Sequence, residues 1–179
     1  MNNSSRNTPQ EIFAQLQETR LFLDWKEKHP KGFLSHFFSS LSFLEESEMH
    51  WEVGFFDPQE EKITVFFQEE MNFSCRAPEK VFQEKDKSVE MLSLQEVKIT
   101  LENALQLFTQ ELQQRYPALK VGQGFVVLQK LQENLLWNVS GMTTSFSVAN
   151  LKMHAITGKI LDMQLIEVVR REKGEMQRN

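Results

Sequence analysis

The feature that most constrains this chain is the alternation of apolar and polar residues between Asn134 and Val169. Leu135, Trp137 and Val139 repeat with the two-residue period of a β-strand, and so do the residues from Ala149 to Ala155. Leu161 to Leu165 resume the same alternation. We therefore predict three antiparallel strands, the first of them central because both its faces carry apolar residues.

The last two of these strands are predicted to form a tight hairpin. Its turn runs from Ala155 to Lys159 and contains Gly158, a residue that adopts a left-handed conformation without a Cβ penalty. Phe146 and Val148 fall on the parity opposite to Ala149, so we expect a bulge or a change of face near Ala149.

These residues resemble a known family. Trp137-Asn138-Val139, followed by Asn150 to Ile160 (NLKMHAITGKI), is similar to the C-terminal hairpin of PepSY-like domains. The chain departs from that pattern at His154, where an aspartate is usual, so no role of that aspartate is carried over. The resemblance covers about residues 95 to 169 and implies a helix packed on an antiparallel sheet, in a cystatin-like layout.

An earlier part of the chain repeats some of this pattern. Gly32 to Leu44 fits either a helix or a strand, and the repeat favours a strand. A hairpin is predicted from the strands Trp51 to Phe56 and Lys62 to Phe67. In it, Trp51-x-Val53 corresponds to Trp137-x-Val139 of the later stretch. Glu61-Lys62-Ile63 corresponds to Gly158-Lys159-Ile160. A left-handed backbone at Glu61 would cost about 1 kcal/mol, because this residue has a Cβ where the later copy has glycine. The first copy then lacks one strand between its tryptophan and its turn.

Two helices are expected, one before each set of strands. Thr8 and Glu11 form a capping-box pair with Pro9 between them, which predicts a helix that stops before His29-Pro30. Thr100 is the predicted N-cap of the second helix, which carries an amphipathic stripe and ends at Tyr116-Pro117.

The expected fold class is α+β, with two unequal helix-plus-antiparallel-sheet repeats of PepSY-like type. Residues 9–70 form the first, abridged repeat and 95–169 the second, with 71–94 as a linker. Residues 1–8 are predicted to be disordered, and 170–179 form a charged tail. Whether the two repeats share one sheet is left open.

Composition excludes several classes of function. The net charge of −5 argues against a nucleic-acid partner. No stretch is long and apolar enough for a membrane span, and Met1 to Gln10 lacks the apolar core of a signal peptide. Cys75 is the only cysteine, so no internal disulfide can form. These features predict a cytoplasmic protein.

Residues that could carry chemistry give no catalytic pattern. The four histidines lack the spacing of a metal site, although His36 and His50 could meet across neighbouring strands. Asp57, Glu60 and Glu61 are expected to be solvated acids of a hairpin turn. Nucleophile elbows, phosphate loops and dinucleotide fingerprints are missing from the sequence. We therefore expect no enzyme, no metal and no cofactor.

Aromatic residues supply the candidate binding surfaces. Trp51 and Trp137 either anchor the helix of their own repeat or line a ligand pocket, which would lie near Trp137. Phe55, Phe56, Phe66 and Phe67 give one hairpin apolar residues on both faces, so some could form an exposed patch for a protein partner or a homodimer.

The resemblance implies a non-enzymatic protein-binding or regulatory module, because PepSY-like domains are associated with the modulation of peptidases. A small apolar-ligand binder with a pocket between helix and sheet is the alternative.

Overall fold

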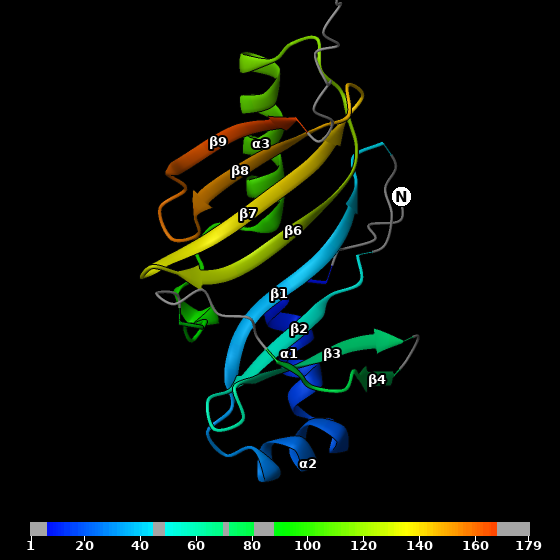
Figure 1. Ribbon diagram of the computed structural model, residues 1–179, viewed down its shortest axis with the longest axis vertical. Helices are drawn as coiled ribbons and strands as arrows, with labels where there is room; N and C mark the ends of the chain where they lie inside the picture. The colour runs from blue at the N-terminus through cyan, green and yellow to red at the C-terminus, as the bar shows by residue number, and fades with distance from the viewer. Residues whose placement is uncertain (1–6, 45–48, 70–71, 81–87, 168–179) are drawn as a thin grey trace, which may run out of the picture.

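Nine strands belong to one antiparallel sheet in the computed structural model, which describes residues 7–44, 49–69, 72–80 and 88–167. Eight of them follow the order β4-β3-β2-β1-β6-β7-β8-β9 (Figure 1), and the ninth, β5, pairs with β3. The strands are β1 (Phe33–Ser42), β2 (Glu52–Asp57), β3 (Lys62–Glu69), β4 (Asn72–Cys75), β5 (Glu79–Lys80), β6 (Val121–Leu131), β7 (Asn134–Thr143), β8 (Ser147–His154) and β9 (Ile160–Glu167). The predicted α+β class is confirmed, and the strands of both predicted repeats share one sheet.

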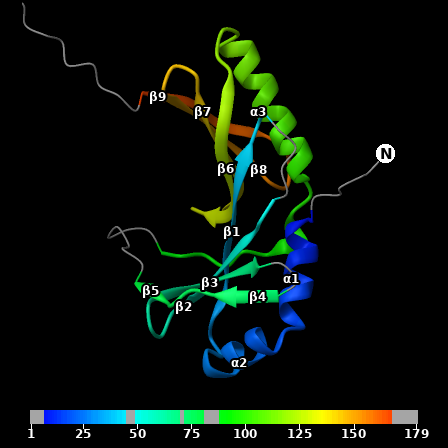
Figure 2. The ribbon, with the colours of Figure 1, turned by 90° about the vertical axis from the view of Figure 1, so that its right-hand side faces the viewer.

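The helices α1 (Pro9–Gln17) and α3 (Leu101–Arg115) lie on the same side of this sheet, as Figure 2 shows, and α2 (Arg20–Lys28) follows α1 at one end. A single 3₁₀ turn, η1 (Leu94–Glu96), precedes α3. The caps are those predicted: Thr8 and Glu11 form a capping box, and the Thr100 hydroxyl accepts the Asn103 amide at 3.3 Å. None of the helices in the described ranges combines the length and hydropathy of a membrane-spanning segment.

The first predicted helix is in fact two helices, which corrects the expectation of one helix up to His29. Thr19 is the reason, because its hydroxyl accepts the Phe22 amide at 3.2 Å and donates to the Leu16 carbonyl at 2.7 Å. The residue thus ends α1 and caps α2. Phe22 and Trp25 are both buried on α2.

Most strand predictions are confirmed. The ambiguous segment from Gly32 to Leu44 contains β1, and β2 and β3 form the predicted hairpin, in which Asp57 pairs with Lys62. Glu61 is left-handed with φ of 54°, and Gly158 closes the later turn with φ of 73°.

The expected bulge near Ala149 is absent from the β7–β8 pair. That ladder runs without a register shift from Leu136 opposite His154 to Met142 opposite Val148. Phe146 belongs instead to the turn between the strands and is left-handed, with φ of 58°. Because the turn ends before Ser147, Val148 simply lies on the other face of β8 from Ala149. The register shift in this region lies between Lys152 and Met153, in the β8–β9 pair.

The predicted linker, residues 71–94, contributes to the sheet and to the core. It contains β4 and β5, both of which pair with β3. Leu92 is only 3% exposed, and its amide donates to the Leu34 carbonyl at 2.8 Å. The domain boundaries themselves stay a prediction. Residues 1–6 and 168–179, which include most of the predicted N-terminal segment and the whole charged tail, lie outside the described residues.

The predicted first copy, residues 9–70, contains three strands, β1 to β3, and the predicted second copy contains four, β6 to β9; the fourth strand on the first side of the sheet, β4, lies in the predicted linker. Trp51 leads into β2 and Trp137 lies in β7, each the second strand after a helical segment. Glu61 lies between the second and third strands of its copy, as Phe146 does, whereas Gly158 lies between the third and fourth. The positional counterpart of Glu61 is therefore Phe146. The first side of the sheet is shortened at its edge strand β4, which has four residues against eight in β9.

Candidate functional site

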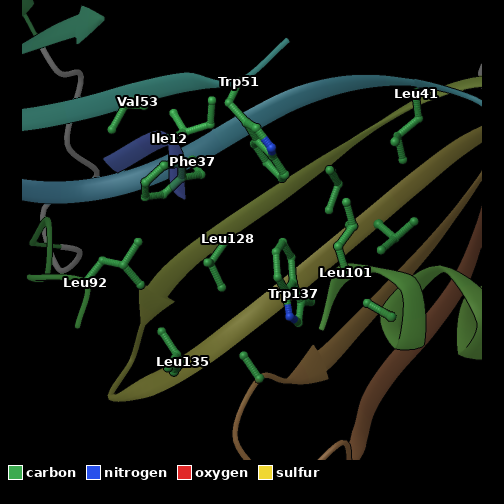
Figure 3. Close-up of a cluster of buried hydrophobic side chains, with 14 of the residues drawn as sticks. Ile12, Phe37, Leu41, Trp51, Val53, Leu92, Leu101, Leu128, Leu135 and Trp137 are labelled. Atoms are coloured by element: carbon green, nitrogen blue, oxygen red, sulfur yellow. The ribbon is translucent and has the colours of Figure 1, made fainter. Parts of the chain in front are cut away.

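Trp51 and Trp137 meet at the centre of the core, with ring centroids 6.4 Å apart (Figure 3). Both are buried, at 0% and 1% exposure. The Trp51 indole N–H donates to the Asn7 carbonyl at 2.8 Å, and that of Trp137 donates to the Ile99 carbonyl at 2.9 Å. Asn7 and Ile99 are the residues before the two N-caps, Thr8 and Thr100. Each tryptophan therefore fastens the start of a helix to the sheet, as one of the two interpretations predicted.

The predicted ligand pocket at Trp137 has little room. The hollow beside this residue lies between the starts of α1 and α3 and has a volume of about 70 Å³. Pockets for small organic ligands have volumes of roughly 300 to 1,000 Å³. This place therefore suits a few water molecules rather than an organic ligand.

The expected exposed patch on the β2–β3 hairpin is wrong for three of its four phenylalanines. Phe55, Phe56 and Phe66 are 3%, 6% and 0% exposed. Phe67 is half-buried and lies under the guanidinium of Arg76, 5.0 Å from the ring centroid. The reason is that both faces of this hairpin are covered.

On the helix side, Phe55 and Phe66 join an aromatic cluster with α2. Phe22 lies 5.0 Å from Phe55 and 5.7 Å from Phe66, measured between ring centroids. Trp25 lies 5.1 Å from Phe55, and its indole N–H donates to the Thr64 hydroxyl at 3.1 Å. On the opposite face, Phe56 packs edge-on against Phe33 at 5.5 Å. The four phenylalanines are thus packed on both faces of the β2–β3 hairpin.

Asp57 corrects the expectation of a solvated turn acid, because it is only 6% exposed. Its carboxylate lies 2.6 Å from His29 Nδ1 and accepts the Gln59 amide at 2.8 Å. Burial raises the pKa of the Asp57 carboxyl, but the hydrogen bonds from His29 and the turn amides outweigh burial and leave it below its usual value. The pair ties the end of α2 to the β2–β3 turn.

Glu60 completes a group of three with His29 and Asp57, whose ligand-type atoms all lie within 4.8 Å of one another. Glu60 is exposed and forms an ion pair with Lys62 at 3.1 Å. In this group the histidine is hydrogen-bonded to Asp57, and Glu60 is paired with Lys62.

His36 and His50 occupy different settings. His36 lies opposite Gly54 on the helix-free face, and its ring covers that glycine so closely that a Cβ there would collide with it. Burial is the main cause of a lowered pKa for His36, and Glu52 acts weakly in the other direction. His50 is exposed and lies outside the strands. Among the described residues, no group of three or more possible metal ligands contains either histidine. The fourth histidine, His154, is the last residue of β8, and its Nδ1 lies 3.2 Å from the Thr157 hydroxyl of the following turn.

An exposed apolar row crosses the second copy, which we call the β7–β9 patch: Met142, Val148 and Ile166, together with Phe146. Met142 pairs with Val148 and Val148 pairs with Ile166, so the three lie side by side on one face. The neighbouring residues Gly141 and Ala149 point to the other side, where α3 packs on β7 and β8. Met142, Phe146 and Ile166 are 41%, 72% and 49% exposed.

The patch ends at an open sheet edge. Among the described residues no strand pairs with the outer side of β9, whose sequence ILDMQLIE contains the acids Asp162 and Glu167 but no lysine, arginine or proline. Natural edge strands are commonly protected by such residues or by being short. The opposite edge strand, β4, has four residues and is followed by Pro78. The long edge and its apolar row therefore offer a surface for an added strand.

Sequence reasoning did not single out this patch. The signal was present, since Phe146 and Val148 fall on the parity opposite to the buried residues of β8. The pattern predicts a bulge or a change of face, because a sheet face cannot be assigned to solvent until the helices are placed.

Comparisons with known proteins show likeness at the level of fold alone. No family model matches the chain, and no curated protein matches its sequence. The structure is similar to the crystal structure of a Clostridium difficile 630 protein described as a "putative lipoprotein", with a TM-score of 0.52 and 13% sequence identity. That match covers 81% of this chain and 90% of the other. At this identity the likeness indicates a shared fold and carries no activity with it.

Proposed function

We propose that this protein is a non-enzymatic protein-binding or regulatory module of PepSY-like type, and that its partner adds an extended strand to β9. The observation that carries the proposal is the apolar row Met142–Val148–Ile166, half-buried at Val148 and exposed at both ends, beside the eight-residue strand β9, whose outer side pairs with no strand that the structure describes. An added strand would satisfy the free backbone groups of β9 and cover apolar side chains at the same time.

Phe146 supports the same proposal. Left-handed backbone is unfavourable for a bulky residue, and this one is also largely exposed. Strain together with exposure of an aromatic ring is typical of residues kept for binding.

The family resemblance suggests the class of partner. PepSY-like domains are associated with the modulation of peptidases, so a peptidase is the partner proposed here. The cytoplasmic location also stays a prediction, and fractionation of native cells tests it. The alternative of an apolar ligand bound at Trp137 is disfavoured by the 70 Å³ hollow.

The test is capture of partners from native cells by the full-length protein and three variants. Phe146→Asp and Ile166→Asp place a charge in the β7–β9 patch, whereas Leu23→Asp does so at an equally exposed apolar residue of α2. We expect one defined partner that binds the wild type and Leu23→Asp and is lost with both patch variants. A partner that binds all four proteins equally would contradict the proposal.

Hydrogen exchange of the complex then tests strand addition itself. Amides of β9 should gain protection when the captured partner is added back, and those of β4 should not. Protection confined to β4 or to the helices would show that the partner uses another surface.

A further inference from the structure

A groove of about 390 Å³ lies between the C-terminal half of α3 and the sheet. This volume lies within the range of small-ligand sites. The groove is far larger than the hollow at Trp137, and it too lies between helix and sheet. The lining residues are Phe43, Leu44, Phe108, Thr109, Leu112, Gln113, Pro117, Leu119, Lys120 and Val121.

The walls of the groove are apolar. Seven of the ten lining residues carry apolar side chains, and Leu44 is 72% exposed at its rim. Phe43 packs against Phe108 with ring centroids 5.2 Å apart. An acyl chain placed here would remove apolar surface from water, which is favourable in proportion to the area covered.

Two glycines set how closely the walls approach the sheet. Gly124 and Gly141 are paired in register on β6 and β7. A Cβ on Gly124 would lie 2.8 Å from the Phe43 ring, and one on Gly141 would collide with Val121 and lie 3.3 Å from Phe108. Because both positions lack a Cβ, Phe43 and Val121 can pack directly against the backbone of the sheet.

The charge among the lining residues of the groove is positive only. Lys120 is the one charged residue among the lining residues, and none of them is a carboxylate, although the whole chain has 25 acidic and 20 basic residues. Lys120 is exposed and forms no ion pair with any residue that the structure describes. A negatively charged group at the end of an apolar ligand would complement it.

We propose that this groove binds a single-chain amphiphile with an anionic head, its acyl chain between α3 and Phe43 and its head at Lys120. The site is independent of strand addition at β9, because it lies on the helix side of the sheet and shares no residue with the β7–β9 patch.

Calorimetric titration of the full-length protein with dodecanoate and with dodecanol, both below their aggregation limits, tests the head group. We expect saturable binding of both and tighter binding of dodecanoate. Lys120→Glu should weaken dodecanoate binding by about tenfold, because it replaces attraction by repulsion, and should leave dodecanol binding unchanged. Lys159→Glu, at an exposed lysine of the β8–β9 turn, is the matched control and should bind both ligands as the wild type does.

A second pair of variants tests the place of the acyl chain. Thr109→Trp fills the groove from the exposed side of α3, whereas Gln106→Trp adds the same ring to the same helix outside the lining. Binding of both ligands should be lost with Thr109→Trp and retained with Gln106→Trp, while both variants melt as the wild type does. No saturable binding of dodecanoate, equal effects of the two lysine variants, or unchanged binding by Thr109→Trp would each overturn the proposal.

Discussion

The two halves of the sheet share an arrangement but fill it with different chemistry. In each half a helix start accepts an indole N–H through the carbonyl before its N-cap, from Trp51 in one and Trp137 in the other. The halves meet where β1 pairs with β6, and four strands follow outward in the same order on each side. These correspondences favour the predicted duplication.

The differences lie in the helices and at the edges. The first half covers its strands with two nine-residue helices and an aromatic cluster around Trp25, whereas the second uses one fifteen-residue helix with a mainly aliphatic stripe. The edge strand of the first half is short, whereas that of the second half is long. The same layout thus accommodates different cores, and the two halves also differ in the length of their outer edge strands.

The largest expected effect concerns the tryptophan pair. Trp51→Ala and Trp137→Ala should each lower the free energy of unfolding by about 3–5 kcal/mol, since each removes a fully buried ring and a hydrogen bond. Chemical denaturation measures both losses, and the double variant should be non-additive because the rings are 6.4 Å apart. If one substitution costs less than about 1 kcal/mol, the two residues are not equivalent anchors.

The next largest expected effect on stability concerns the turn after the second strand, which the two halves support in different ways. In the first half Asp57 supports the turn with a buried carboxylate, and in the second Thr143 does so with a hydroxyl that accepts the Ser147 amide. Asp57→Asn should lower stability by about 2 kcal/mol at neutral pH, the loss expected for hydrogen bonds to a charged group.

The acid dependence of this effect has a defined sign. The folded-state pKa of Asp57 is lowered, so its contribution is present above the ordinary value of 3.8 and is lost as pH falls through the folded pKa. The gap between wild type and Asp57→Asn in denaturant titrations should therefore close in strong acid. A gap independent of pH would mean that the carboxylate charge has no part in holding the turn.

His36 gives a second pH dependence, confined to the first half. Its folded-state pKa is lowered from 6.5, so the unfolded chain binds more protons below that value and stability falls as pH drops from about 6.5 toward the folded pKa. One proton contributes at most about 1.4 kcal/mol per pH unit. His36→Gln should flatten this part of the curve, and a curve unchanged by the substitution would contradict the prediction.

The smallest effect tests the turn correspondence. Glu61 and Phe146 occupy matching turns and are both left-handed, with φ of 54° and 58°. Replacing either by glycine should raise the free energy of unfolding by up to about 1 kcal/mol, because glycine has no Cβ penalty there. Gly158→Ala should instead lower stability, since its φ is 73° and a Cβ would lie 3.3 Å from Ile99. Opposite signs for Glu61→Gly and Phe146→Gly would break the match between the halves.

Local signals explain what could be predicted from the sequence. Thr8, Thr100 and Gly158 act through bonds to residues a few positions away, so their roles follow from spacing alone. The strands around Trp51 and Trp137 followed from their alternation. The break at Thr19 was missed, although threonine is a frequent N-cap, because the apolar spacing across it is compatible with one continuous helix.

Long-range packing explains what could not be predicted. Alternation identifies the two faces of a strand, but it does not say which face a helix covers or whether the other face is also filled. Phe55 and Phe66 are buried by α2, and Phe56 is covered by Phe33 of the neighbouring strand β1. Both apolar faces of the hairpin are therefore packed against other residues and are not exposed to solvent. Asp57 is buried for a similar reason, because His29 comes to it from the end of α2.

The sequence by itself determined the starts of α1 and α3, the β2–β3 and β8–β9 turns and most of the antiparallel strands, since each depends on contacts between near neighbours. The tertiary structure decided that both halves share one sheet, that β4 and β9 are its edges, and that the β7–β9 patch and the α3 groove face outward. Those outcomes depend on which strands pair and where the helices come to rest, and these are contacts between residues far apart in the chain.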